Sequence, residues 1–231
     1  MSGRNRYAYT LCRFVLIGPA LRLMGRPRII GREHIPRRGP VILAANHLAV
    51  ADSFYLTLAA RRPTTFLAKA EYFEGRGIVG AAKRRFFSAL GQIPVDRRGG
   101  SAASPALEAA VGIVRRGGAW GIHPEGTRSP DGRLHRGRTG AIRVAMETGA
   151  PLVPVAITGT ARSISSPRWR RRVVVQILPP MDLTPYRRMG PPGVRAATDS
   201  LMHTIGHQTG QAYIDSYAKS WQATDAKADA A

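Results

Sequence analysis

The strongest constraint on the fold is the alternation of short apolar runs with longer segments of helical periodicity. Short apolar runs between turn signals are typical of buried strands. Their alternation with helices is typical of an α/β domain. We therefore expect a single α/β domain with a mostly buried central sheet flanked by helices. The expected strands are Val41–Ala45, Thr65–Ala68, Gln92–Val95, Ala119–Ile122, Leu152–Ile157 and Val173–Leu178, and the expected helices span 53–61, 76–90, 103–116, 138–149 and 194–220.

The N-terminal segment is unusually apolar for a solvated helix, but Arg13, Pro19 and Arg22 interrupt it. These residues make it a poor membrane-spanning helix. An amphipathic helix lying in the membrane interface, with arginine tips among the headgroups, fits the pattern. Packing on the domain's own core remains the alternative. The expected organisation is a membrane-associating helix over 1–28, a catalytic domain over 29–221 and a disordered tail over 222–231.

The chain of 231 residues carries 35 basic and 14 acidic residues, a formal net charge of +21. Such a charge implies attraction to polyanions, which include nucleic acids, anionic lipid surfaces and phosphorylated substrates. Charge alone does not choose among them. A single cysteine, Cys12, excludes an internal disulfide and favours a reducing compartment.

An amide and an imidazole, Asn46 and His47, end the first apolar run, and Asp52 follows five residues after the histidine. Residues five apart on one helix do not face each other. The pair therefore meets only if His47 lies in a turn and Asp52 in the first turns of the next helix. A carboxylate on one imidazole nitrogen leaves the other free as a base. The alternative is that these residues merely cap a strand and a helix.

A second polar stretch, "GIHPEGTRSPDG" at 121–132, also follows an apolar run. Arginine, a threonine hydroxyl and backbone N–H groups together can cradle a phosphate. Glu125 would repel phosphate, so orienting Arg128 or binding a hydroxyl suits it better. A plain surface turn is the alternative, because Asp-Gly at 131–132 is a hairpin signal.

Together these stretches resemble the glycerolipid acyltransferase family, typified by the 1-acyl-sn-glycerol-3-phosphate acyltransferases. The resemblance runs over about residues 29–160, with four blocks in the family's order. The first block is Asn46-His47 with Asp52, and the third is Pro-Glu-Gly-Thr-Arg-Ser at 124–129. The second block is "GQIPVDR" with Arg97, the fourth is "LVPVAI" with Pro154, and Lys69 in "FLAKAEYF" matches a further family feature.

The resemblance implies direct transfer of an acyl group from acyl-CoA or acyl-carrier protein to the hydroxyl of 1-acyl-sn-glycerol-3-phosphate. His47 is then the general base and Asp52 its support. No metal or other cofactor is implied. The remaining roles are acceptor-phosphate binding for Arg97, Glu125, Gly126, Thr127 and Arg128, donor or oxyanion contact for Lys69, and structural support for Asn46 and Pro154.

The implied location is the cytoplasmic face of a membrane, as a peripheral or monotopic protein on an anionic surface. Ala49, His123 and Leu134 differ from residues common in the family, which leaves substrate choice open. Another lysophospholipid or glycerol phosphate is an alternative acceptor. A basic nucleic-acid-binding protein is the alternative from another class, because of the run "RWRRR" at 168–172. His203 and His207 have metal-compatible spacing but no obvious third ligand.

Overall fold

The computed structural model describes residues 18–69, 77, 80–81, 92–95, 103–161 and 172–219, and its centre is a seven-stranded sheet. The strand order is β1-β8-β7-β2-β5-β3-β4. Neighbouring strands are parallel except for β7 and β8, so the sheet is mixed. The strands are β1 (Arg28–Ile30), β2 (Val41–Ala45), β3 (Thr64–Lys69), β4 (Gln92–Val95), β5 (Ala119–Ile122), β7 (Leu152–Thr158) and β8 (Val174–Ile177).

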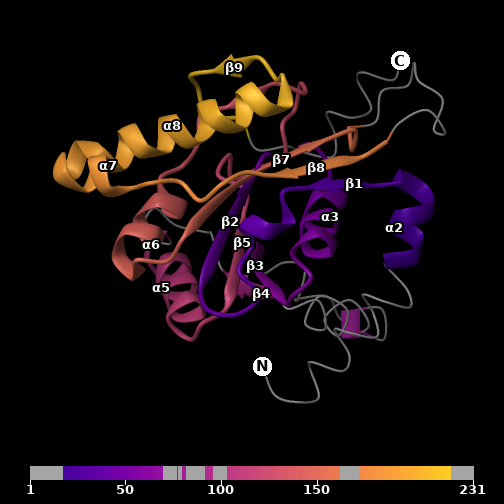
Figure 1. Cartoon of the computed structure of the whole chain (residues 1–231), viewed down its shortest axis with the longest axis horizontal. Helices are drawn as coiled ribbons and strands as arrows, with labels where there is room; N and C mark the ends of the chain where they lie inside the picture. The colour runs from indigo at the N-terminus through magenta and orange to yellow at the C-terminus, as the bar shows by residue number, and fades with distance from the viewer. Residues whose placement is uncertain are drawn as a thin grey trace.

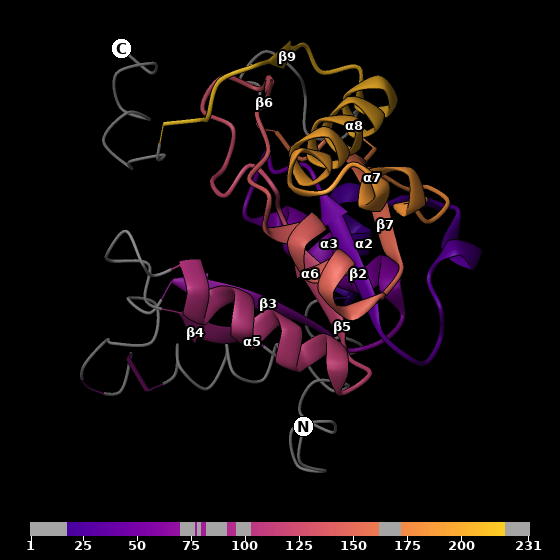
Figure 2. The ribbon, with the colours of Figure 1, turned by 90° about the vertical axis from the view of Figure 1, so that its left-hand side faces the viewer.

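Helices cover both faces of the sheet, with α5, α6 and α8 on one side and α3 and α2 on the other (Figure 1). Figure 2 views the molecule from the side of α5 and α6. The expected α/β fold with a flanked central sheet is therefore confirmed. The helices are α2 (Gly18–Gly25), α3 (Ala51–Ala60), α5 (Ala103–Arg115), α6 (Gly140–Thr148), α7 (Thr184–Arg188) and α8 (Pro191–Thr209), with a 3-10 turn, η2 (Arg32–His34), and a second small sheet of β6 (Leu134–His135) and β9 (Tyr213–Ile214).

Strand β2 shows why its sequence is apolar without alternation. Ile42 and Ala44 pack against the cluster formed with α5, α6 and α8, while Leu43 packs against the cluster under α3. Successive side chains point to opposite faces of a sheet, so a strand covered on both faces has no polar side. Fully burying a leucine or isoleucine side chain contributes about 1.5–3 kcal/mol.

The expected strands are all present. Three have the expected bounds, and the other three differ by one residue at one or both ends. The expected helices 53–61, 103–116 and 138–149 correspond to α3, α5 and α6. The expected helix 76–90 lies mostly outside the described residues, as does the tail 222–231. Strand β1 and helix α7 were not predicted, since each is short and its sequence has little periodicity.

The expected final helix, 194–220, was wrong at its end. Helix α8 ends at Thr209, because Gly210 adopts a left-handed φ of 71° and its N–H donates to the Gly206 carbonyl at 2.9 Å. Glycine favours this conformation, which terminates many helices. Residues 210–219, here called the C-terminal strap, then run back along the molecule so that β9 pairs with β6.

One side of helix α2 packs on the domain's own core. Leu21 packs beside α3, and its carbonyl accepts a hydrogen bond from the Tyr55 hydroxyl at 3.3 Å. Leu23, in contrast, is 83% exposed. Residues 1–17 lie outside the described part of the chain. Among the described helices, none has both the length and the apolar character needed to cross a bilayer.

The parallel strands decide where polar side chains collect. Because β2, β5 and β3 are parallel neighbours, their carboxyl ends lie at the same edge of the sheet. The chain leaves β2 at Asn46 and leaves β5 at His123. The two polar stretches singled out in the sequence therefore meet at this edge.

Candidate active site

The Asn46 side chain continues the pairing of β2 with β7 beyond the end of the strand. It is fully buried, and it exchanges two hydrogen bonds with the Ile157 backbone. Its Nδ2 donates to the Ile157 carbonyl at 2.8 Å, and its Oδ1 accepts from the Ile157 N–H at 2.8 Å. An apolar strand thus ends on an amide because the amide substitutes for a backbone partner. The turn that follows starts from a fixed point.

The His47 ring and the Asp52 carboxylate meet as the sequence predicted. Asp52 lies in the first turn of α3, and its Oδ2 is 3.1 Å from Nδ1 of His47. The same oxygen accepts the backbone N–H groups of Leu48 and Ala49, at 2.6 and 2.7 Å. A carboxylate accepts hydrogen bonds, so Nδ1 carries the proton in the neutral ring. The lone pair then lies on Nε2.

Asp52 remains ionised although it is fully buried. Burial by itself would raise the pKa of the carboxyl group. The hydrogen bonds from His47 and from the Ala49 N–H outweigh burial, and the pKa is below its ordinary value. A buried negative charge therefore lies against the ring nitrogen opposite to Nε2.

Glu125 links the two polar stretches through hydrogen bonds. It is 1% exposed, and its two oxygens accept backbone N–H groups of His47 at 2.9 Å and of His135 at 3.1 Å. Burial raises the pKa of Glu125 to about 7, against the opposing effect of these two hydrogen bonds. The carboxylate thus connects the turn after β2 with β6.

Two further links join the stretches. The Ser129 N–H donates to the His47 carbonyl at 2.7 Å. His123 is largely buried after β5, with Nδ1 3.0 Å from the carbonyls of both Ala45 and Asn46. The turn after β2 is therefore bound on several sides by the segment that follows β5.

The turn 124–129 contains Arg128, which directly precedes the residue that bonds to His47. Gly126 has a φ of 77°, and its N–H donates to the His123 carbonyl at 3.0 Å. A Cβ at Gly126 would lie 2.7 Å from Nε of Arg138, so that side chain packs directly over the turn. Thr127 and Arg128 are partly exposed, and the next residue, Ser129, bonds to His47.

Of the other predicted site residues, two lie in strands that the structure describes and one lies outside the described residues. Lys69 is the last residue of β3, so its backbone lies at the same edge of the sheet as the ends of β2 and β5. Pro154 is buried in β7, one residue before β7 begins to pair with β8. Arg97 lies outside the described residues.

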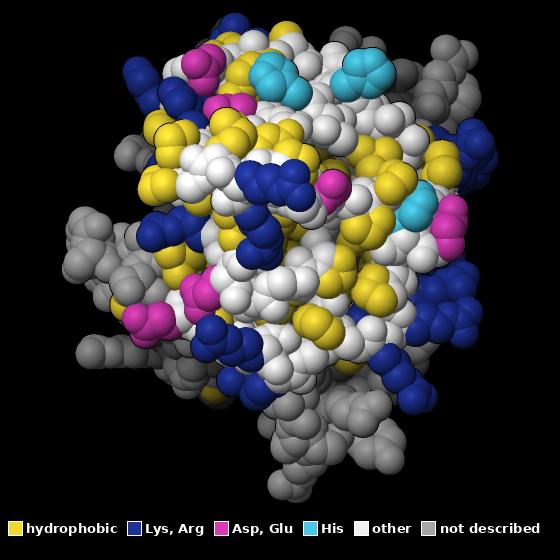
Figure 3. Space-filling view, turned by 60° about the vertical axis from the view of Figure 1, so that its left-hand side comes forward, with side chains coloured by type: hydrophobic (Ala, Val, Ile, Leu, Met, Phe, Trp, Pro, Cys, Tyr) yellow, Lys and Arg dark blue, Asp and Glu magenta, His cyan; other side chains and the backbone are white. Residues whose placement is uncertain are grey.

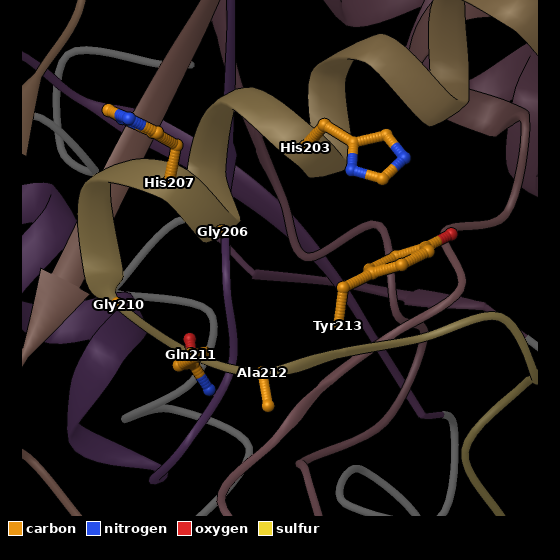
Figure 4. Close-up of a pocket in the computed structure, with 7 residues that line it drawn as sticks. All are labelled: His203, Gly206, His207, Gly210, Gln211, Ala212 and Tyr213. Carbon is orange, nitrogen blue, oxygen red and sulfur yellow. The ribbon is translucent and has the colours of Figure 1, made fainter.

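Gln211, in the C-terminal strap, contacts the site although no sequence pattern indicated it. Its Oε1 accepts from Asn46 Nδ2 at 2.9 Å, and its Nε2 donates to the Gly132 carbonyl at 2.7 Å. It lies 165 residues from Asn46 along the chain, and no local pattern indicates such a contact. Figure 4 shows it in the turn between α8 and β9, at the wall of a shallow pocket.

The same pocket contains the two histidines that have metal-compatible spacing. His203 and His207 project from α8, and the His203 ring centroid lies 4.7 Å from that of Tyr213 (Figure 4). Over the described part of the chain, no three His, Cys, Asp or Glu side chains come together as metal ligands would.

The surface over α5 to α8 carries more basic than acidic side chains (Figure 3). A positive surface attracts anionic substrates and lipid headgroups. The exposed arginines on these helices and the turn after α5 are Arg115, Arg116, Arg143, Arg187 and Arg188.

Several known proteins are similar to this chain. The 1-acyl-sn-glycerol-3-phosphate acyltransferase of Limnanthes alba is 30% identical over 180 residues, which are 73% of this chain and 59% of that protein. The enzyme of that name from Borreliella burgdorferi is 30% identical over 132 residues, 57% of this chain and 51% of that protein. A chloroplastic one from Brassica napus is 31% identical over 135 residues, 58% and 38% respectively. The chain thus spans between about two fifths and three fifths of the length of these relatives.

A solved structure shares this fold, and a known sequence family matches the chain. The crystal structure of the 1-acyl-sn-glycerophosphate (LPA) acyltransferase PlsC from Thermotoga maritima superposes with a TM-score of 0.65 at 25% identity, covering 91% of this chain and 85% of that one. The family named Acyltransferase matches residues 26–158, which include the turns after β2 and β5. That match takes in more than half of the chain, and the chain therefore belongs to the acyltransferase family.

Proposed function

We propose that this protein transfers a fatty acyl group from an acyl thioester to the free hydroxyl of 1-acyl-sn-glycerol-3-phosphate, giving phosphatidate. The observation that carries the proposal is the hydrogen bond between His47 and the buried Asp52 carboxylate. The relatives whose names specify this acceptor supply the choice of substrate.

In the proposed reaction His47 acts as the general base through Nε2. It removes the proton from the acceptor hydroxyl as the oxygen attacks the thioester carbonyl. The tetrahedral intermediate then collapses, the carbon–sulfur bond breaks, and the thiol leaves with the proton that the His47 imidazolium returns. The Asp52 carboxylate stabilises the imidazolium while it exists. The acyl group passes directly to the acceptor, without an acyl-enzyme.

The acceptor phosphate is assigned to Arg128 and Arg97. Arginine binds phosphate through a planar fork of N–H donors. The hydrogen bond from Ser129 to His47 supports the role of Arg128, because it keeps the neighbouring turn close to the base. Gly126 and Thr127 would line the same pocket. Glu125 would support this pocket by accepting hydrogen bonds from the backbone N–H groups of His47 and His135.

The donor is acyl-CoA or acyl-carrier protein, and Lys69 is assigned to the thioester end of the site. A cation near the carbonyl would stabilise the negative charge that develops on its oxygen. The position of Lys69 at the carboxyl end of β3 supports this assignment, since β3 ends at the same edge as β2 and β5. Asn46 and Pro154 support the site structurally.

The membrane contact is assigned to the N-terminal segment on a cytoplasmic, anionic surface. Leu23 is 83% exposed on α2, and Arg22, Arg26 and Arg28 are exposed near it along the chain. An apolar side chain among exposed arginines suits a lipid interface. Leu21 packs on the core instead, so α2 belongs in part to the folded domain.

The first prediction concerns the base. His47→Ala should lower kcat by roughly 100- to 10,000-fold, the usual contribution of a general base. Asp52→Asn should also lose most activity, because it removes the charge that stabilises the imidazolium. His207→Ala, an exposed histidine on α8, is the control and should keep wild-type kcat. Thiol release and phosphatidate formation measure the rate, and circular dichroism checks folding. Wild-type turnover by folded His47→Ala protein would contradict the proposed mechanism.

The second prediction concerns the acceptor phosphate. Arg128→Ala should raise the KM for lysophosphatidate about 10- to 100-fold, since hydrogen bonds to charged groups contribute about 1.5–3 kcal/mol. The KM for the acyl donor should stay within about twofold of wild type. Arg128→Lys should rescue poorly because lysine lacks the planar fork. Arg143→Ala removes the same charge from the exposed face of α6 and serves as the control. An unchanged acceptor KM in Arg128→Ala would place the phosphate elsewhere.

The third prediction concerns the membrane. Deleting residues 1–17 leaves α2 and its contact with Tyr55 in place, so the domain should still fold. The deleted protein should sediment less with anionic liposomes than the full chain. Binding by the full chain should weaken as salt rises, because salt screens the arginines. Equal sedimentation of both proteins across a salt series would assign the N-terminal residues another role.

A further inference from the structure

A second imidazole lies flat against the ring of His47. The ring centroids of His47 and His123 are 3.9 Å apart, and their planes differ by 9°. The two residues follow different strands, β2 and β5, which are neighbours in the sheet. Parallel stacking at this distance restricts the tilt of the His47 ring, while the hydrogen bond that Nδ1 donates to Asp52 fixes only one edge of the ring.

The His123 ring is itself held on both edges. Its Nδ1 lies 3.0 Å from the carbonyl oxygens of Ala45 and Asn46, so this nitrogen must carry a proton to donate. Its Nε2 lies 2.9 Å from the Ser53 hydroxyl and, in the neutral ring, accepts from it. Adjacent residues of α3 thus fix the two rings, since Asp52 bonds to His47 and Ser53 bonds to His123.

His123 stays uncharged while His47 gains and loses a proton. Burial and, to a smaller extent, the neighbouring His47 lower the pKa of His123 to about 3, against the opposing effects of Asp52 and of the Ala45 and Asn46 carbonyls. A neutral aromatic face attracts a cation placed over it. The stack therefore tolerates both the neutral ring of His47 and its imidazolium. With Nε2 already bonded to Ser53, His123 is a poor second base.

We propose that His123 is a positioning residue, whose flat ring sets the plane of the His47 imidazole and so aims Nε2 at the acceptor hydroxyl. The proposal rests on the proposed acyl transfer at His47. His123 touches neither substrate in this assignment and acts only through His47. Small errors in the direction of a catalytic group lower the rate sharply.

Two variants separate the ring face of His123 from its hydrogen bonds. His123→Asn keeps an amide donor near the position of Nδ1, facing the carbonyls of Ala45 and Asn46, but it removes the flat ring. His123→Phe combined with Ser53→Ala keeps a flat ring and removes the hydrogen bonds, without leaving the serine hydroxyl unpaired. Circular dichroism and urea unfolding identify any variant that fails to fold.

The ring face should decide the rate. His123→Asn should lower kcat about 10- to 100-fold, with the KM of both substrates within about twofold of wild type. The Phe–Ala double variant should recover most of the lost turnover, because the stack returns. Wild-type kcat in folded His123→Asn protein would overturn the proposal. So would a folded double variant as slow as His123→Asn, since the hydrogen bonds would then matter and not the ring.

A nuclear magnetic resonance measurement keeps this inference distinct from the proposed function. The ring current of His123 should shift the Hε1 proton of His47, a resonance assigned by its loss in His47→Ala. The shift should vanish in His123→Asn and persist in the Phe–Ala variant. If the wild-type protein shows this shift but transfers no acyl group, the proposed function has failed. If it transfers acyl groups without the shift, the stacking inference has failed.

Discussion

The Asp52 carboxylate holds together the turn that contains the proposed base, His47. One of its oxygens accepts hydrogen bonds from Nδ1 of the His47 ring and from the backbone N–H groups of Leu48 and Ala49. An ionised carboxylate in a buried position is costly unless hydrogen bonds compensate for lost water. Here the compensating groups are the turn that leads from β2 into α3. The charge therefore stabilises the turn, and the turn keeps the charge ionised, so a change in either one affects the other.

The sheet makes this arrangement possible by bringing two loops to one edge. β2 and β5 are parallel neighbours, and the segments that follow them are joined by Glu125, by Ser129 and by His123. Asn46 fixes the turn to β7, and Gln211 adds a contact from the C-terminal strap. Because backbone groups supply most of these bonds, the imidazole is held by the fold and not by one flexible contact. Such preorganisation is what efficient proton transfer requires.

The sequence predicted the parts of this structure that depend on local pattern. The apolar runs indicated the strands, and the five-residue separation of His47 and Asp52 indicated a turn followed by a helix. Contacts between distant segments had no such signal, as Gln211 and Ser53 show, because each bonds to a residue far along the chain. The predicted end of α8 was wrong because the left-handed conformation of Gly210 ends the helix before the periodic pattern runs out. The catalytic and binding roles of all the predicted site residues, from His47 and Asp52 to Lys69 and Arg97, stay predictions.

Glu125 shows how burial changes an interpretation made from residue type. In the sequence it stands between a proline and a glycine in a polar turn, where an exposed carboxylate facing a substrate hydroxyl is a natural expectation. In the structure both oxygens accept backbone N–H groups, and burial raises the pKa to about 7. A residue in the turn proposed to bind substrate thus holds the backbone of the proposed base.

The protonation of the His47 ring tests the central claim most directly. A general base at Nε2 of His47 requires the proton on Nδ1, facing Asp52, and the lone pair on Nε2. Long-range proton–nitrogen correlation spectra of ¹⁵N-histidine-labelled protein distinguish the two ring nitrogens and show which one carries the proton. We predict a protonated Nδ1 and an unprotonated Nε2 for His47. A neutral ring with its proton on Nε2 would leave no base facing the acceptor and would contradict the mechanism.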